Sequence, residues 1–185
     1  MLARISKYFY AVSTGWAALF GLVVFAFFIG FVLPQQAQKA QAYNAEAGSP
    51  DTSFFYSAAD LYRMAESYGA EGRSAYIRAR FTFDLVWPLA YLLFLTLTVS
   101  WALACAIPAA DRWRLLNLFP LAGFLFDYLE NISASLVMGR YPASTPVIDS
   151  LAPIFTAVKW FFVNGSFAIL VIGLLLALWR RMQTA

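Results

Sequence analysis

The sequence consists of four long apolar runs separated by one long and two short polar segments. The first run, residues 8–33, contains no charged residue and is followed by Pro34, which we expect to end the helix. It is about twice as long as the apolar core of a signal peptide, and we therefore interpret it as a retained transmembrane helix. The four predicted transmembrane spans cover about residues 8–33, 85–107, 115–138 and 153–179.

The long polar segment, residues 34–84, is too long for a connection without structure of its own. Ser57 and Asp60 have the spacing of a helix-capping box and Gly69 is a helix stop, so we expect a short amphipathic helix over about residues 58–68. Its apolar face would lie on the membrane surface or cover one end of the bundle. The predicted fold class is all-α, a four-transmembrane-helix bundle with a helical outer cap formed by the long first loop.

Composition supports a membrane protein, because 62% of the residues are hydrophobic and 12% are charged, where soluble domains have about 25% charged residues. We expect one membrane domain over residues 1–185. A single cysteine, Cys105, excludes an intrachain disulfide and a CxxC redox pair. The chain has no histidine, the commonest metal ligand and general base, and we expect neither a metal nor a cofactor. The net charge is +3, but the basic residues form no contiguous patch along the sequence, so no nucleic-acid partner is expected.

The positions of Lys and Arg near the ends of the spans predict an orientation in the membrane. On one side they are dense in three short segments, whereas on the other they are spread over the long loop and mixed with acidic residues. We therefore expect both termini in the cytoplasm of a bacterial cell, with the long first loop outside the inner membrane. The dense side contains Arg4, Lys7, Arg112, Arg114, Arg180 and Arg181.

The third predicted span carries three polar residues, Asp127, Glu130 and Asn131, in an otherwise apolar run. Their spacing of three and four places them on one face of a helix. Each charge facing lipid would cost about 2.5–3.5 kcal/mol, so these groups must be buried, paired or neutralised. Lys159, in the outer half of the fourth span, is the expected partner of Glu130 or Asp127, because the short loop makes these helices antiparallel neighbours.

A second polar stripe leads into the second span. Steps of three and four place a run of basic, aromatic and acidic side chains on one face of a helix that we expect to continue into the membrane. Arg80 and Asp84 are four residues apart and would form an ion pair at the head-group level. The candidate ligand-binding residues are Asp84, Asp127, Glu130, Asn131, Lys159, Arg80, Arg73, Tyr76 and Tyr91.

Two interpretations of this polar set remain open. In the first, the charges pair with one another and fix the register of the helices. In the second, they line a cavity that holds a lipid head group, a small polar or cationic ligand, or a proton on Asp127. The favoured function is a non-catalytic accessory subunit or a ligand- or lipid-binding membrane protein, whose partners are the lipid bilayer, such a ligand, another protein or a second copy.

Catalytic patterns fit the sequence less well. An intramembrane aspartyl protease needs two facing carboxylates, and the fourth span offers Lys159 instead of a second acid. The alternatives are an enzyme that uses Asp127 and Glu130 for acid–base chemistry on a lipid, or a proton- or cation-coupled carrier. Four spans without an internal repeat would require such a carrier to act as an oligomer.

Several short motifs resemble those of a group of uncharacterised bacterial four-span membrane proteins. The resemblance extends from about Asp60 to Trp160 and implies the same fold, but it implies no activity. The motifs are Gly69-x-x-Gly72-Arg73-x-x-Tyr76, Asp84-x-x-x-Pro88, Phe126-Asp127-x-x-Glu130-Asn131 and Lys159-Trp160.

Overall fold

The computed structural model describes residues 1–44 and 47–184, so that residues 45–46 of the expected outer loop lie outside the described residues. The described residues form helices and turns without a strand, which confirms the all-α prediction. In chain order the elements are α1 (Leu2–Val12), α2 (Gly15–Phe27), the π-helical turn η1 (Phe28–Val32), α3 (Leu33–Asn44), the 3₁₀ turn η2 (Pro50–Thr52), α4 (Ala58–Ser67), α5 (Gly69–Arg80), α6 (Phe83–Ala106), the 3₁₀ segment η3 (Arg112–Leu118), α7 (Phe119–Arg140) and α8 (Ile148–Thr184).

Three helical stretches within the described residues are long and apolar enough to cross a membrane, namely Gly15–Tyr43, Gly69–Ala106 and Ile148–Gln183. The shorter helix α7, which carries Asp127 and Glu130, is not one of them. These lengths and this composition are consistent with a helical membrane bundle.

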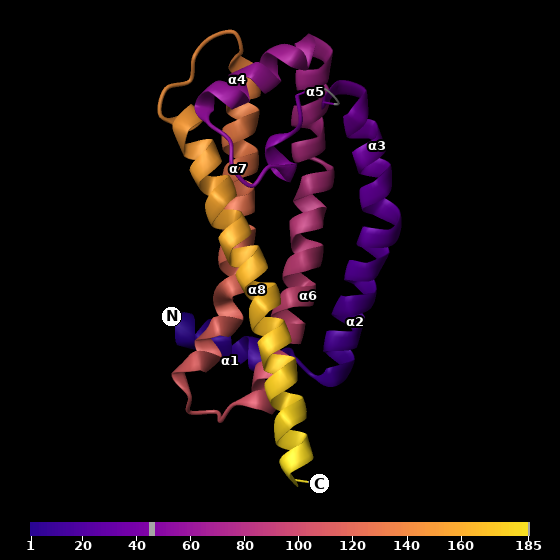
Figure 1. The fold of residues 1–185 in the computed structure, drawn as a ribbon, viewed down its shortest axis with the longest axis vertical. Coiled ribbons are helices and arrows are strands. Elements are labelled where there is room, and N and C mark those ends of the chain that lie inside the picture. Colours follow the sequence, from indigo (N-terminus) through magenta and orange to yellow (C-terminus); the bar gives the residue numbers. More distant parts are fainter. Residues whose placement is uncertain (45–46, 185) are drawn as a thin grey trace.

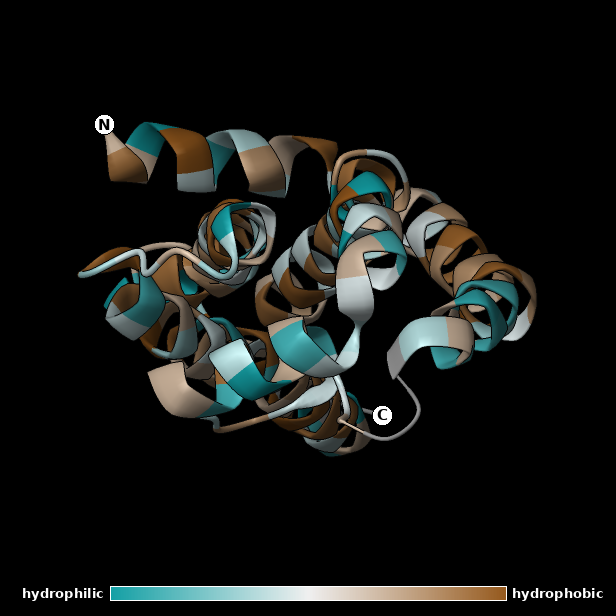
Figure 2. Ribbon diagram, turned by 90° about the horizontal axis from the view of Figure 1, so that it is seen from above, coloured by the Kyte–Doolittle hydropathy of each residue, from teal (hydrophilic) through white to brown (hydrophobic). Residues whose placement is uncertain are grey.

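The helices α6, α7 and α8 form a three-helix core, and the rod made of α2, η1 and α3 lies at its side (Figure 1). α7 packs along α8, and α6 packs against both. The continuous rod α2–η1–α3 packs on α6 and α5, and the view from above shows it at the edge of the bundle (Figure 2). A Cβ atom added to Gly21 of α2 would lie 3.1 Å from Cα of Phe94, so the glycine allows the backbones of α2 and α6 to approach closely.

The upper end of the bundle in Figure 1 is covered by α4 and α5. Ser57 and Asp60 form the predicted capping box at the start of α4, and Gly69, with φ of +61°, separates α4 from α5. Leu61 and Ala65 of α4 are buried against Val137 and Met138 of α7. The amphipathic helix therefore covers the ends of α7 and α8.

The first predicted span is wrong in both of its boundaries. The chain turns at Ser13, and α1 lies across the lower ends of α6 and η3 instead of continuing into α2. Thr14 causes the break, because its side chain accepts a hydrogen bond from the backbone N–H of Ala17 and caps a new helix.

Pro34 does not end the helix. The backbone N–H of Leu33 donates to the carbonyl of Phe28, five residues earlier, which makes the preceding turn a π-helix. This wider turn accommodates a proline ring that would crowd the carbonyl four residues before it in a regular α-helix. The rod α2–η1–α3 consequently continues to Asn44.

Three other boundaries also differ from the prediction. The expected continuous helix into the second span is interrupted at Phe81 and Thr82, between α5 and α6. The chain enters α7 through the 3₁₀ segment η3 rather than as an α-helix from Leu115. α8 extends beyond the predicted 153–179 at both ends, and Pro153, which lies inside the helix, does not end it.

The lower end is closed by hydrogen bonds between α1, η3 and α6. The buried amide of Asn117 donates to Ser100 Oγ at 3.1 Å and accepts from Ser6 Oγ at 2.8 Å. The hydroxyl of Tyr10 donates to the carbonyl of Arg114 at 2.7 Å, and burial raises its pKa to about 12. α1 is therefore a fixed part of the lower end.

Candidate functional site

Of the two partners predicted for Lys159, Glu130 and Asp127, the structure pairs it with Glu130. Lys159 of α8 and Glu130 of α7 form an ion pair in which both side chains are buried. Lys159 Nζ also lies 5.1 Å from the ring centroid of Trp160. Because two charges without water are stable only as a pair, each of these residues requires the other.

Asp127 lies next to this pair but has different partners. Its two carboxylate oxygens accept hydrogen bonds from the hydroxyl of Tyr91 at 2.9 Å and from the amide of Asn131 at 3.3 Å. All three side chains are buried. Tyr91 belongs to α6, so this group joins α6 to α7, while Lys159 and Glu130 join α7 to α8.

Arg80, at the end of α5, is the centre of a second ionic group. Its Nε lies 2.7 Å from Asp84 Oδ2, as the spacing of four predicts. The same guanidinium pairs with Asp51 of η2 and lies 4.7 Å from the ring centroid of Tyr76. The hydroxyl of Tyr76 donates to Asp51 Oδ1 at 3.4 Å. One buried cation thus holds two carboxylates.

The structure brings eight of the nine predicted candidate residues into these groups. The exception is Arg73, whose guanidinium donates to the carbonyl of Ala65 at 2.8 Å and lies 4.9 Å from the ring centroid of Tyr141. Arg73 therefore fixes α5 to α4 and to the start of the α7–α8 loop.

Asp51 is a member of the site that sequence reasoning missed. It follows Pro50 in a Gly-Ser-Pro-Asp turn, and such residues are ordinary turn formers. The turn brings Asp51 to Arg80, and the segment that follows the turn, residues 53–56, crosses the bundle to α8. There Trp160 Nε1 donates to the carbonyl of Ser53 at 3.2 Å, and Thr156 Oγ1 donates to the hydroxyl of Tyr56 at 3.0 Å. The pKa of Tyr56 is raised well above its usual value, mainly by burial and to a smaller extent by the negative charge of Glu130.

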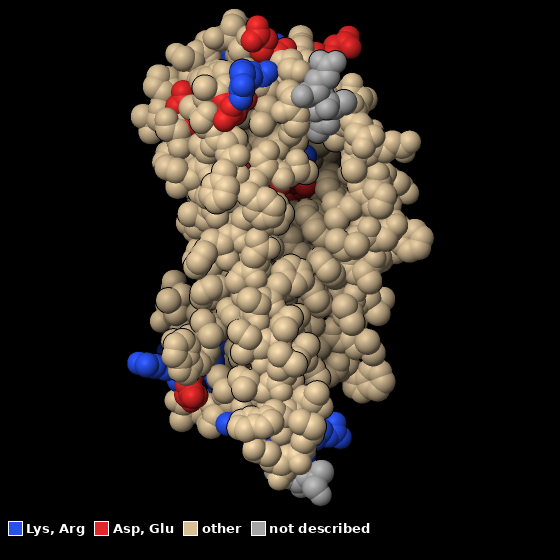
Figure 3. Space-filling model, viewed as in Figure 1, with Lys and Arg blue, Asp and Glu red and all other residues tan. Residues whose placement is uncertain are grey.

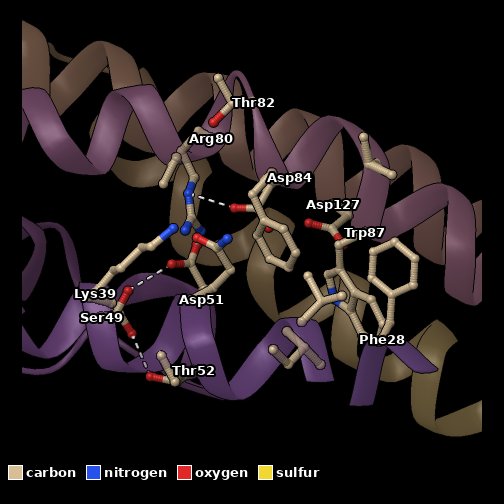
Figure 4. A pocket seen from close by; sticks show the side chains of 18 of the residues that line it. Phe28, Lys39, Ser49, Asp51, Thr52, Arg80, Thr82, Asp84, Trp87 and Asp127 are labelled. Atoms are coloured by element: carbon tan, nitrogen blue, oxygen red, sulfur yellow. Dashed lines mark hydrogen bonds and ion pairs between the residues drawn. The ribbon is translucent and has the colours of Figure 1, made fainter. Parts of the chain in front are cut away.

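A cavity of about 1340 Å³ lies between the rod α2–η1–α3 and the three-helix core. Its upper part is polar, and Figure 4 shows Lys39, Asp51, Arg80, Asp84 and Asp127 around it. Lys159 also lines this part, whereas its partner Glu130 does not. The lower part is formed by large apolar side chains, which include Phe25, Val163 and Phe167, while Phe28 and Trp87 lie at its border with the polar part, beside Asp127.

The cavity runs along the helices. Phe25 and Lys39, which line its two parts on the same rod, are 14 positions apart in the sequence, or roughly 20 Å at 1.5 Å per residue. Figure 3 shows a hollow between α8 and the rod, with acidic side chains visible inside it and uncharged surface around it. The cavity therefore combines a charged upper end with an apolar lower end and is open at the side of the bundle.

Within residues 1–44 and 47–184 no three acidic or cysteine side chains come together in a group that could hold a metal ion. Comparison of the chain with protein-family models, with curated proteins and with solved structures found no match in any of the three. Function is therefore inferred from the geometry of the chain's own residues.

Proposed function

We propose that this chain is a four-span integral membrane protein that binds an amphiphilic molecule, with the head group in the polar upper part of the cavity and the hydrocarbon chain in the apolar lower part. The observation that carries this proposal is the division of one laterally open cavity into a charged and an apolar end. Ligand sites are mostly apolar clefts with a few converging polar groups, and this cavity has that composition.

In this proposal α7 also spans the membrane, as the third of four spans in chain order, although it is the least apolar of the long helices. It directs Asp127, Glu130 and Asn131 inward and exposes aliphatic side chains, which is the distribution expected of a helix surrounded by lipid. The exposed aliphatic residues are Leu125, Leu129, Ile132 and Leu136.

We place the lower end of the bundle in the cytoplasm and the upper end outside the inner membrane of a bacterial cell. In support, α1, η3 and the end of α8, which carry the dense basic residues, lie together at the lower end (Figure 1). α4, α5 and the loop around η2 would then form an outer cap above the cavity, and amphiphiles of the outer leaflet would reach the cavity from the side.

Binding is better supported than catalysis. Acid–base chemistry by Asp127 and Glu130 would need both carboxylates at the substrate, but Glu130 is fully buried, pairs with Lys159 and does not line the cavity. The remaining acids at the cavity, Asp84 and Asp51, are both held by Arg80.

Native mass spectrometry of protein extracted gently from its own membrane tests the proposal. Ala40→Trp fills the cavity from α3, whereas Gln38→Trp adds the same ring to the same helix at an exposed residue that does not line the cavity. We expect wild type and Gln38→Trp to retain an amphiphile of defined mass and Ala40→Trp to lose it. Equal amounts of bound amphiphile in all three proteins would overturn the proposal.

A further inference from the structure

We propose that the head group in the cavity is an organic ammonium and that Asp127 is its counter-ion. This inference rests on the proposed amphiphile binding and adds the chemical class of the ligand. It follows from the distribution of charges in the upper part of the cavity and from the aromatic rings next to Asp127.

Among the buried charges of the site, acids outnumber bases. Four carboxylates, those of Asp51, Asp84, Asp127 and Glu130, face two buried cations, Arg80 and Lys159. Lys39 and Arg78 also line the cavity, but on exposed parts of α3 and α5. Asp51 is partly exposed and shares Arg80 with Asp84, so the buried charges alone, which are Asp84, Asp127, Glu130, Arg80 and Lys159, leave one acid in excess.

Asp127 accounts for this excess. Arg80 pairs with Asp51 and Asp84, and Lys159 pairs with Glu130, whereas Asp127 forms no ion pair among the residues that the structure describes. Its hydrogen-bond donors, Tyr91 and Asn131, are neutral. Asp127 is 8% exposed and lines the cavity, so that its side chain can be reached from the cavity.

Aromatic rings complete a site for a cation. Figure 4 shows Asp127 beside Trp87 and Phe28. The ring centroid of Trp87 lies 5.9 Å from that of Phe28 and 5.8 Å from that of Tyr91. The faces of such rings attract ammonium groups, most strongly where water is excluded. Trp160 already has this role toward Lys159 within the same cavity.

An anionic head group fits the same site less well. A phosphate bound there would lie near the carboxylate of Asp127. Arg80, the buried arginine at the cavity, is already shared by two carboxylates, and Arg78, which also lines the cavity, is exposed. Like charges in a site without water repel strongly, whereas an ammonium would neutralise the excess charge.

The test measures affinities of single-chain probes for the protein in neutral maltoside micelles by native mass spectrometry. The probes are dodecyltrimethylammonium, dodecylphosphocholine and dodecyl phosphate, which share one chain. We expect the trimethylammonium probe to bind more tightly than the phosphate probe, and Asp127→Asn to weaken its binding about tenfold. Asp149→Asn removes the same charge from the start of α8, away from the cavity, and should leave the binding of all three probes unchanged.

The outcomes separate this inference from the proposed function. Tighter binding of the phosphocholine probe, lost in Asp127→Asn, would support the ammonium and assign it to a zwitterionic lipid, while tighter binding of the trimethylammonium probe would assign it to a simple cationic amphiphile. If the phosphate probe binds as tightly as the trimethylammonium probe, or Asp127→Asn does not change the affinity of the probes, the assignment of the head group as an ammonium is wrong, but the proposed amphiphile binding stands. If no probe binds, or Ala40→Trp binds all of them like wild type, the proposed function itself is wrong.

Discussion

The upper and lower halves of the bundle are stabilised in different ways. The lower half packs apolar side chains such as Val99, Leu103 and Leu170 and closes its end with neutral hydrogen bonds around Asn117. The upper half buries the charged side chains of Arg80, Asp84, Asp127, Glu130 and Lys159. Because buried charges stabilise a fold poorly compared with apolar packing, the upper half carries groups that folding alone does not require. The upper half is where we propose that the head group binds.

The largest expected effect is in the upper half. Lys159→Met leaves Glu130 buried without a cation, and we expect a loss of about 3–5 kcal/mol in the free energy of unfolding, measured by steric trapping in mild detergent. The double variant Lys159→Met, Glu130→Gln should lose much less, because no unpaired charge remains. Strictly additive losses in this double-mutant cycle would show that the two side chains do not act as a pair.

The contact between the rod and the core tests packing without charge. Gly21→Leu should push α2 away from Phe94, and we expect a loss of about 3 kcal/mol in the same unfolding measurement. Gly30→Leu is the matched control, since no atom lies within 4 Å of a Cβ added to Gly30. A similar loss in both variants would mean that the loss comes from the helix backbone and not from the α2–α6 contact.

At the lower end, Asn117→Ala removes the hydrogen bonds to Ser6 and Ser100 from a fully buried site. We expect a loss of about 2 kcal/mol, because the partner groups are left without hydrogen bonds. Amphiphile binding, measured by native mass spectrometry on the folded variant, should remain that of wild type. Loss of the bound amphiphile would contradict the separation of the two halves.

The smallest effect concerns the helix that covers the upper end. Ser57→Ala removes the side chain that accepts from the backbone N–H of Asp60, and we expect a loss of about 1 kcal/mol. Hydrogen exchange should increase locally in α4, with the amides of α7 unchanged. Increased exchange throughout α7 would mean that α4 and the core open together.

Local signals in the sequence predicted some parts of this structure correctly. The capping box at Ser57 and the ion pairs Arg80–Asp84 and Lys159–Glu130 follow from spacing and from the cost of unpaired charge in an apolar helix. The bundle of apolar helices follows from composition. These features depend on neighbours in the sequence or on helices joined by a short loop.

Features that depend on tertiary context were missed. Thr14 lies inside an uninterrupted apolar run, so the sequence does not mark it as a helix start. It caps α2 where α1 turns away to pack against α6. Pro34 continues the rod because a π-turn precedes it, which no spacing rule indicates. Asp51 is distant in sequence from Arg80 and reaches it only through the path of the loop across the bundle.

The central claim is that one amphiphile lies in the cavity with its head group up and its chain down. Photo-crosslinking with two dodecyltrimethylammonium probes, one with a diazirine beside the head group and one at the chain end, tests it directly. We expect the first to label the peptide around Trp87 and Tyr91 and the second to label those around Phe25 and Phe167, with both labels lost in Ala40→Trp. Labelling spread over the exposed face at the end of α8, and unchanged in Ala40→Trp, would contradict the claim.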